Sequence, residues 1–367
     1  MNRIAAVAVL VFLLSGPNAQ AQVKPADEVT FFPTYSYYEP ATPRMRCVFE
    51  VHGWIYEPVR ESLKRKALLA VLRKTLGVES EDPSAGLFDE RARWFLVENK
   101  EHRRLDVRFG IEVHSLGVES DEAGHVRSRL VGWEGKESDL TGEAELKCGW
   151  VKFEAVTEGA GARKFKGEVL FMAPAGVSVV SDIDDTIKVT NVRDRRALVR
   201  NTFEKPYEAV PGMADLYRAL AARGAAFHYL STGPWQLYPP IREFIDAKKF
   251  PLGTFHMRDF SLTHSEFFSL FESPDKWKPT QIEPLIERFP KRRFILIGDS
   301  GEKDPETYGA LARKYPEQVA GSFIRNVTKD PADPDRFKKA FEGVPPEKWK
   351  VFRDPVEVLG KALELTK

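Results

Sequence analysis

The sequence predicts an α/β protein in two parts: a smaller β-rich part, then a parallel sheet with helices on both faces. In the first part, strand-like segments follow one another between short turns, which is typical of a mostly antiparallel, β-sandwich-like domain. In the second part, strand-like and helix-like segments alternate, which is typical of a parallel sheet. The run Ala173-Pro174-Ala175-Gly176 separates the two patterns, so we expect domains at residues 22–172 and 173–367.

The first 21 residues have the pattern of a secretory signal peptide. Asn2-Arg3 gives a positive start, residues 4–14 an apolar core, and Ala19-Gln20-Ala21 a small-residue cleavage site. Cleavage after Ala21 predicts an exported chain, periplasmic or secreted, that begins at Gln22. An uncleaved anchor is the alternative, although the apolar run is short for a bilayer. No later run approaches ~18 apolar residues, so we expect no transmembrane segment after signal removal.

The composition excludes several classes of function. A formal net charge of +1 offers no overall attraction to nucleic acid, so we expect no nucleic-acid partner. Seven scattered histidines and two cysteines do not form a zinc-ligand pattern. Cys47 and Cys148 are compatible with one disulfide in an exported chain or with two free thiols, and the sequence leaves both open.

In the first domain, alternating β-forming residues predict a strand over residues 46–56. A helical pattern of leucines follows over residues 62–76 and stops at Gly77. Further strands are expected at residues 104–116, 126–133, 143–156 and 166–172, with a hairpin loop at 159–162. We find no catalytic constellation in this domain, and its aromatic residues are typical of a core.

The second domain begins with an apolar strand at residues 177–181, bounded by Gly176. Helices expected at 212–223, 241–247 and 279–289 alternate with strands expected at 225–230 and 293–297. In a parallel sheet, ligands bind beyond the carboxyl ends of the strands. The polar residues expected to meet at this edge are Asp182, Asp184, Ser231 and Asp299.

The end of the first strand concentrates negative charge. Extended geometry alternates the side chains, so Asp182 and Asp184 are expected on one side and Asp185 on the other. Two carboxylates ~4 Å apart repel by roughly 4 kcal/mol at an effective dielectric of ~20, so the pair needs a cation or a shared proton. Ligands that are all oxygen favour Mg2+. The strand end therefore predicts a metal and phosphate site.

Four ordered motifs resemble those of phosphatases of the haloacid dehalogenase (HAD) superfamily. They are Asp182-Ile-Asp-Asp-Thr186, Ser231 after an apolar strand, a downstream lysine, and Gly298-Asp-Ser-Gly-Glu-Lys-Asp304. More narrowly, the chain resembles the actin-patch-protein type of phosphatidate phosphatase. The residues that carry this narrower likeness are Tyr229-Leu-Ser-Thr-Gly-Pro-Trp235, Phe289-Pro290, the run from Gly298 to Glu306, and Gly53-Trp-Ile-Tyr-Glu-Pro58. The resemblance implies an HAD-like, Rossmann-type fold for the second domain.

The resemblance also implies Mg2+-dependent hydrolysis of a phosphomonoester through an aspartyl-phosphate. Asp182 would be the nucleophile, because a carboxylate is already ionised at neutral pH. Asp184 would protonate the leaving oxygen and later accept a proton from water, a role that favours a raised pKa. Thr186 would hydrogen-bond the strand-end loop at the substrate site, with a simple helix-initiating role as the alternative.

The same resemblance assigns the phosphate-binding residues. Ser231 would bind a phosphoryl oxygen together with the turn at Thr232 and Gly233, although a serine in this position also serves as a simple helix cap. Arg258 is a further candidate for holding the phosphate. An active-site lysine would neutralise charge on the nucleophile and the phosphate. Lys276 and Lys278 compete for this role, and Lys278 is preferred because it directly precedes the expected helix.

For the metal, the resemblance implies a shell from Asp182, Asp299 and Asp184, the last through its carbonyl oxygen, completed by water. Asp304 would stand behind this shell and orient the lysine or a metal-bound water.

Two features bear on the substrate. Only a short insert fits between Thr186 and Pro211, too short for a large cap domain, so an open site is expected. Residues 267–271 form an apolar run that fits either a groove for acyl chains or a core helix. The resemblance suggests phosphatidate at a membrane surface. The alternatives are a soluble phosphomonoester or phosphoprotein as substrate, or a non-catalytic protein that binds an envelope partner.

Overall fold

The computed structural model describes residues 23–41, 44–59, 63–78, 85–135, 148–157, 163–260, 276–328 and 334–367. The chain divides into two compact units. The first unit combines the residues up to Ile55 with Lys100–Ala173, and the second combines Tyr56–Asn99 with Pro174–Lys367. The sequence-predicted features that lie outside the described residues are the signal peptide at 1–21, residues 143–147 of the strand expected at 143–156, the loop at 159–162 and the apolar run at 267–271.

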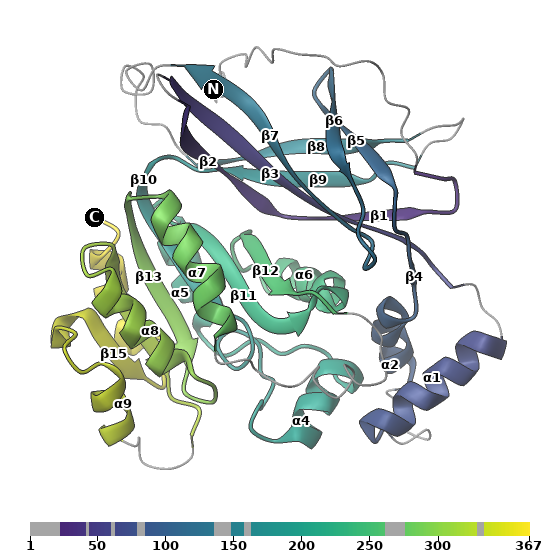
Figure 1. Ribbon diagram of the computed structural model, residues 1–367. Helices are drawn as coiled ribbons and strands as arrows, with labels where there is room; N and C mark the ends of the chain where they lie inside the picture. The colour runs from purple at the N-terminus through teal and green to yellow at the C-terminus, as the bar shows by residue number, and fades with distance from the viewer. Residues whose placement is uncertain are drawn as a thin grey trace, which may run out of the picture. The chain divides into compact units, whose positions relative to one another are not determined.

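The first unit is built on antiparallel strands (Figure 1). Its strands are β1 (Glu28–Phe32), β2 (Thr34–Ala41), β3 (Arg44–Glu57), β5 (Arg104–Phe109), β6 (Glu112–Glu119), β7 (His125–Gly135), β8 (Gly149–Val156) and β9 (Lys166–Phe171). The expected strand at 104–116 is therefore a hairpin of two strands. A short parallel pairing of β2 with β9, at Thr34↔Val169 and Tyr35↔Leu170, joins two antiparallel halves into one sheet. The two-residue β4 (Glu98–Asn99) pairs with the end of β3 and is the ninth strand of this sheet. Both halves contribute to a single core, which includes Phe49, Val107 and Phe153.

The two cysteines are free thiols, so the disulfide alternative is wrong for this structure. Cys47 lies on β3 opposite Tyr38 of β2 and is buried in the core. Burial raises the pKa of its thiol to about 11. Cys148 precedes β8, where its sulfur accepts a hydrogen bond from the amide of Ala173 at 3.5 Å. The two sulfur atoms therefore have different environments and are not bonded to each other.

The second unit contains a six-stranded sheet in which every pairing is parallel. The strand order is β12-β11-β10-β13-β14-β15. The bounds are β10 (Ala175–Asp182), β11 (Ala226–Pro234), β12 (Thr254–Arg258), β13 (Lys291–Asp299), β14 (Val319–Arg325) and β15 (Trp349–Phe352). This arrangement confirms the predicted parallel sheet, and β10 lies between β11 and β13 at its centre.

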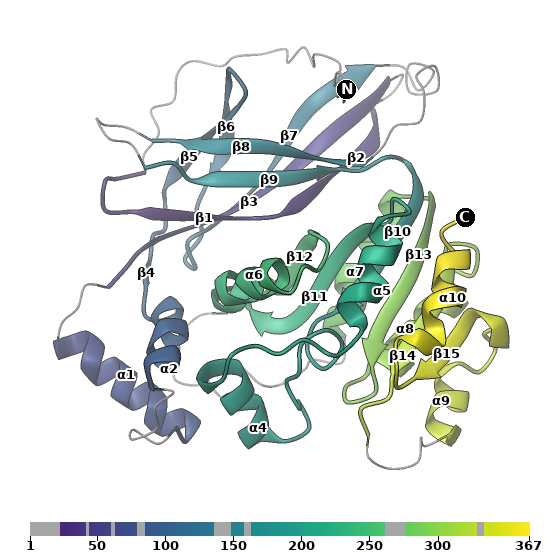
Figure 2. The same cartoon turned by 180° about the vertical axis from the view of Figure 1, so that it is seen from behind.

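Helices cover both faces of this sheet. The longer helices are α5 (Met213–Ala221), α6 (Tyr238–Ala247), α7 (Trp277–Arg288), α8 (Asp304–Lys314) and α10 (Val356–Glu364), with shorter α4 (Arg195–Val199) and α9 (Pro334–Ala340). Figure 1 shows α7 and α8 in front of the sheet, and Figure 2 shows α5 and α10 on the opposite face. Helix α5 buries Met213, Leu216, Tyr217 and Leu220, whose spacing is that of one helical face.

The segment Tyr56–Asn99 packs with the second unit, although the sequence places it in the first domain. It contains α1 (Leu63–Leu76), α2 (Ala85–Ala92), a 3₁₀ turn at Arg93–Phe95 and β4 (Glu98–Asn99). Phe88 and Phe95 each lie with their ring centroids 5.7 Å from that of Phe203. These aromatic contacts bring the segment into the core of the second unit. None of the helices among the described residues is both long and apolar enough to cross a membrane.

Candidate active site

The carboxyl ends of the central strands bring the predicted polar residues to one edge of the sheet. Asp182 ends β10 and is paired in register with Leu230, so Ser231 follows directly on the neighbouring strand. Asp299 ends β13, on the other side of β10. Asp182 and Asp299 are only 1% and 0% exposed, which places two carboxylates in a low-dielectric environment. The predicted convergence at this edge is therefore present in the structure.

A buried cluster of carboxylates forms around these strand ends. Asp182, Asp299 and Asp304 each offer an oxygen, and these oxygens lie within 4.8 Å of one another. Asp304 begins α8, and its Oδ2 accepts a hydrogen bond from the amide of Asp299 at 3.1 Å. Gly298 allows this approach, since a Cβ there would lie 2.2 Å from Asp304 Oδ2. The Gly298 to Asp304 motif thus closes a tight turn that brings two of its carboxylates together.

Lys278 supplies a positive charge to this cluster. Its Nζ lies 2.8 Å from Asp182 Oδ1 and 3.0 Å from Glu302 Oε2, and it donates a hydrogen bond to Asp304. Burial lowers the pKa of Lys278, but the surrounding carboxylates outweigh burial and raise the pKa well above its ordinary value. Lys276 is exposed at the start of α7, so Lys278 is the lysine that lies in the site.

The cluster has the donor set of a cation site. Burial, and then the neighbouring acidic groups, raise the pKa values of Asp182 and Asp299 well above the ordinary range, although Lys278 opposes this. Asp182 Oδ2 and Asp299 Oδ2 are buried, and the described residues offer neither a hydrogen-bond partner. Orphaned carboxylate oxygens beside further acidic groups are the ligands that Mg2+ takes. The residues present therefore fit a divalent cation held by Asp182 and Asp299.

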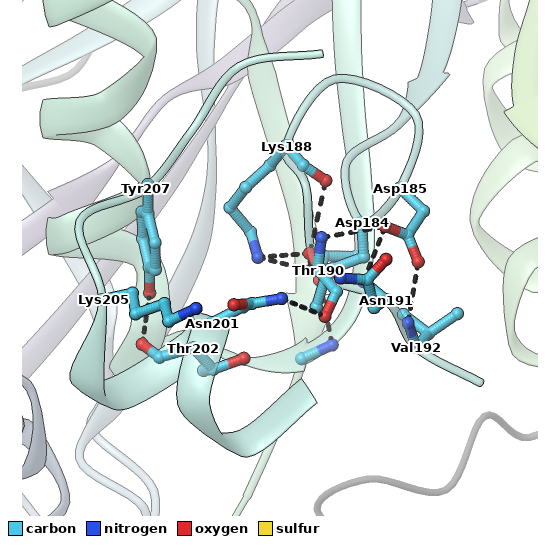
Figure 3. Close-up of polar contacts among 12 residues, drawn as sticks. Asp184, Asp185, Lys188, Thr190, Asn191, Val192, Asn201, Thr202, Lys205 and Tyr207 are labelled. Atoms are coloured by element: carbon cyan, nitrogen blue, oxygen red, sulfur yellow. Dashed lines mark hydrogen bonds and ion pairs between the residues drawn. The ribbon is translucent and has the colours of Figure 1, made fainter. Parts of the chain in front are cut away.

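Asp184 takes a different direction from the one expected. Strand β10 ends at Asp182, so the strand alternation does not extend to Asp184. Its Oδ1 lies 2.8 Å from Lys188 Nζ and accepts a hydrogen bond from Thr190 (Figure 3). Its Oδ2 accepts a hydrogen bond from Ser231 at 2.9 Å. The carboxylate is thus committed to these partners. Any contribution of Asp184 to a metal shell is left to its backbone carbonyl.

The expectation of a raised pKa for Asp184 is wrong. Burial acts to raise the pKa, but the Lys188 ammonium and the hydrogen bonds from Lys188, Thr190 and Ser231 outweigh it and lower the pKa below its ordinary value. Lys188 is itself only 2% exposed, and its ammonium also donates to Thr190 Oγ1 at 2.6 Å. Asp184 is therefore held as a carboxylate by a buried lysine.

The loop after β10 is organised by Asp185 rather than by Thr186. Asp185 adopts a left-handed backbone with a φ of 57°. Its carboxylate accepts hydrogen bonds from the amides of Thr190, Asn191 and Val192 at 2.7–2.8 Å (Figure 3). The Thr186 hydroxyl is buried, and the described residues offer it no hydrogen-bond partner. The loop-fixing role that the sequence assigns to Thr186 therefore belongs to its neighbour.

A cavity of about 610 Å³ opens beside this loop, within the second unit. Ser231, Thr232 and Gly233 line it together with Asp184, and Ser231 Oγ also accepts the amide of Gly233 at 3.0 Å. Arg258 ends β12 and is half-buried, but it is not among the described residues that line the cavity. The predicted Ser-Thr-Gly turn therefore faces the cavity, and Arg258 does not.

The insert between Thr186 and Pro211 forms a wall of this cavity. The cationic side chains that line the cavity are Lys188, Arg193, Lys303 and Arg336. The apolar lining includes Val192, Leu198, Leu237 and Ile241, and Thr202 and Tyr207 complete the wall from the insert. Although the insert is short, it bounds one side of the space beyond the strand ends.

Several residues of the site are missing from the sequence-predicted set. Lys188 follows the first motif by two positions, and Glu302 lies inside the quoted Gly298 to Asp304 run, so both carried a local signal. Arg336 carried none: it lies on α9, and its guanidinium donates to the carbonyls of Ser300 and Glu302 and to both carboxylate oxygens of Glu306. It holds the turn that follows Asp299 from the side of the cavity.

One segment of the chain matches a family of known proteins. Residues 177–326 match the family model described as the catalytic domain of phosphatidate phosphatase APP1. Phosphatidate phosphatase APP1 of Saccharomyces cerevisiae is 34% identical over 168 residues, which are 44% of this chain and 28% of that protein. An uncharacterized protein of Schizosaccharomyces pombe is 29% identical over 184 residues, 49% of this chain and 30% of that protein. The chain thus spans less than a third of the length of these relatives.

A class C acid phosphatase from Bacillus anthracis, solved with tungstate bound, is a structural match at 12% identity. It covers 46% of this chain and 80% of that one with a TM-score of 0.27, a likeness too low to support a conclusion about the fold. The match of residues 177–326 covers Asp182, Ser231, Lys278 and Asp299, which the structure brings to one sheet edge. Residues 177–326 are therefore similar to the catalytic domain of phosphatidate phosphatase APP1, and they contain the residues that meet at this sheet edge.

Proposed function

We propose that the protein is a Mg2+-dependent phosphomonoester phosphatase with an HAD-like catalytic unit, and that it hydrolyses phosphatidate to diacylglycerol and phosphate. One observation carries this proposal: Asp182 and Asp299 each bury an unpaired carboxylate oxygen beside Lys278 in a segment that matches a phosphatase family. A buried excess of acidic groups raises the free energy of the fold unless a cation offsets it. The buried carboxylates thus lower the stability of the cation-free protein and favour the binding of a cation.

Asp182 would act as the nucleophile. In the first step its carboxylate oxygen forms a bond to phosphorus, and the bond from phosphorus to the leaving oxygen breaks. Lys278 supports this step because its ammonium lies 2.8 Å from the other oxygen of the same carboxyl group. When bound, Mg2+ would offset the repulsion between the attacking carboxylate and the phosphate. Water then cleaves the aspartyl-phosphate, which regenerates Asp182 and releases phosphate.

Asp184 would move the protons. It would donate one to the leaving alkoxide and take one from the attacking water in the second step. Its present partners, Lys188 and Ser231, both line the cavity, so a phosphate group bound there competes with Asp184 for their donors. Substrate entry would thus free Asp184 from the contacts that lower its pKa.

The lipid substrate is suggested by the family match and by the lining of the cavity. Cationic side chains suit a phosphate headgroup, and the apolar side chains beside them suit the glycerol backbone and the first acyl carbons. We further propose that the protein is exported, on the basis of residues 1–21. Mass spectrometry of the secreted or periplasmic protein tests this point, because cleavage leaves a chain that begins at Gln22.

Purified mature protein is the material for the main test. Release of phosphate from dioctanoyl phosphatidate, sugar phosphates and a phosphopeptide is measured with Mg2+ and with EDTA. The proposal expects turnover of phosphatidate that depends on Mg2+ and that Asp182→Asn abolishes. Preference for the sugar phosphates or the phosphopeptide would overturn the lipid assignment. Absence of turnover on every ester, in a folded protein with Mg2+ present, would favour a binding role.

A further inference from the structure

The cavity wall formed by the insert rests on a side chain from a distant part of the chain. Arg91, near the end of α2, donates from Nη1 to the carbonyls of Thr202 and Lys205, each at 2.7 Å. Its guanidinium carbon lies 3.8 Å from the ring centroid of Tyr207. Thr202 and Tyr207 are the residues through which this part of the insert reaches the cavity. One arginine thus contacts both.

These contacts satisfy groups that the insert cannot satisfy by itself. Residues 200–204 form a short π-helix that ends before Lys205, and carbonyls at a helix end lack partners within the helix. The Tyr207 hydroxyl donates to the carbonyl of Thr202 at 3.1 Å (Figure 3). Arg91 donates to the same carbonyl. Both hydrogen bonds come from Nη1, while the guanidinium lies over the ring of Tyr207. An ammonium could donate to two carbonyls, but it has no planar group to stack on the ring.

The contacts of Arg91 with the wall are buried, so their loss should destabilise the wall. Arg91 is 5% exposed and Tyr207 is 8% exposed. The ring of Tyr207 also lies 4.8 Å from the ammonium of Lys188, which contacts Asp184. Movement of the ring would therefore alter the surface next to the proposed proton donor. The chain of contacts runs from α2 through Tyr207 to the phosphate end of the cavity.

We propose that Arg91 is a positioning residue that sets the cavity wall, so that the segment Tyr56–Asn99 governs which phosphate esters the catalytic unit accepts. The role in selection rests on the proposed function, whereas the role in holding the wall does not. Arg91 lies outside the segment matched by the catalytic family, residues 177–326. The selectivity of the site therefore depends on a part of the chain that precedes the catalytic segment.

Arg91→Lys is the decisive variant, because it keeps the charge and removes the planar guanidinium that lies over Tyr207 and places Nη1 between the two carbonyls. Arg73→Lys is the matched control: Arg73 is on the same segment, pairs with Asp89 at 2.6 Å and lies over the ring of Phe88, so the change removes a guanidinium that also lies over an aromatic ring. Steady-state kinetics are measured with dioctanoyl phosphatidate and with p-nitrophenyl phosphate. Hydrogen exchange of residues 199–207 is measured in the same proteins without substrate.

For Arg91→Lys we expect KM for dioctanoyl phosphatidate to rise about tenfold with kcat within about twofold, and faster exchange at residues 199–207. KM and kcat for p-nitrophenyl phosphate should stay near those of the wild type, because this smaller ester makes fewer contacts with the cavity wall. Arg73→Lys should leave KM and the exchange unchanged. Equal changes in both variants, or unchanged exchange in Arg91→Lys, would overturn the proposal. Inactive wild-type protein with the expected exchange difference would refute the proposed function alone.

Discussion

Lys278 Nζ lies 2.8 Å from Asp182 Oδ1 inside a buried group of acidic side chains. We expect Asp182→Asn to reduce turnover on the order of 10⁴-fold or more, because the amide is a poor nucleophile. The melting temperature without metal should hold or rise, since the change removes repulsion with Asp299 and Asp304. Asp215→Asn is the control, because Asp215 is exposed on α5. A folded Asp182→Asn enzyme with wild-type turnover would exclude the nucleophile role.

From the contacts of Arg336 we predict how strongly activity depends on the Mg2+ concentration. It holds the carbonyls of Ser300 and Glu302, which follow Asp299 in the turn. Arg336→Gln should raise the Mg2+ concentration for half-maximal activity by roughly 10–100-fold, as expected when the support of a metal ligand is lost. Arg313→Gln is the control, because Arg313 holds the carbonyls of Ala340 and Glu342 at a distance from that turn. Identical metal dependence in Arg336→Gln and wild type would contradict this role.

His125 predicts how the first unit responds to acid. Burial, and then the Arg127 charge, lower the pKa of His125 to about 3. The Nδ1 atom of His125 lies 3.0 Å from Nε2 of His52, within hydrogen-bond distance. An unfolded histidine titrates near pH ~6.5, so the unfolded chain alone takes up this proton as the pH falls from about 6.5 toward 3. The free energy of unfolding should therefore be about 2 kcal/mol lower at pH 5 than at pH 7.5.

His125→Gln should remove that part of the acid sensitivity. Hydrogen exchange of β3 and β7 at pH 7.5 and pH 5, corrected for intrinsic rates, measures the stability of this unit in the whole chain. His102→Asn is the control, because His102 is exposed and its backbone is left-handed, which asparagine tolerates. Equal acid sensitivity in wild type and His125→Gln would show that another group carries the effect.

We expect alanine substitutions at two helical glycines to change stability in opposite directions. A Cβ at Gly309 of α8 would lie 2.0 Å from the carbonyl oxygen of Ala340, so Gly309→Ala should destabilise the second unit by a few kcal/mol. Apart from the adjoining backbone of α10, no described atom lies within 4 Å of a Cβ at Gly360, so Gly360→Ala should stabilise by about 0.5–1 kcal/mol. Thermal unfolding of both variants checks the pair, and a stabilised Gly309→Ala would contradict the packing of α8.

The meeting of Asp182, Ser231 and Asp299 could be predicted from the sequence, because the ends of parallel strands share an edge. The direction of Asp184 could not, since it depends on β10 ending at Asp182 and on the left-handed turn at Asp185. Strand periodicity carries no information about such a turn. The free state of Cys47 likewise depends on tertiary neighbours, which sequence spacing does not reveal.

The membership of Tyr56–Asn99 in the second unit was equally hidden, because boundary signals in a sequence assume that each domain is continuous. Only contacts such as Phe88 with Phe203 identify a segment that leaves one unit and joins the other. The roles of Arg91 and Arg336 were also hidden in the sequence. Their roles arise from long-range contacts with backbone carbonyls, and a carbonyl has no sequence signature.

The discontinuous second unit has a consequence for synthesis. Arg91 and its acceptor Thr202 are 111 residues apart, and ribosomes add about 5–20 residues per second, so α2 waits roughly 5–20 s for its partner. During this delay Phe88 and Phe95 have no Phe203 to pack against. The nascent chain therefore carries an uncovered aromatic surface until its later half emerges, and a chaperone that binds such surfaces would bind the segment Tyr56–Asn99.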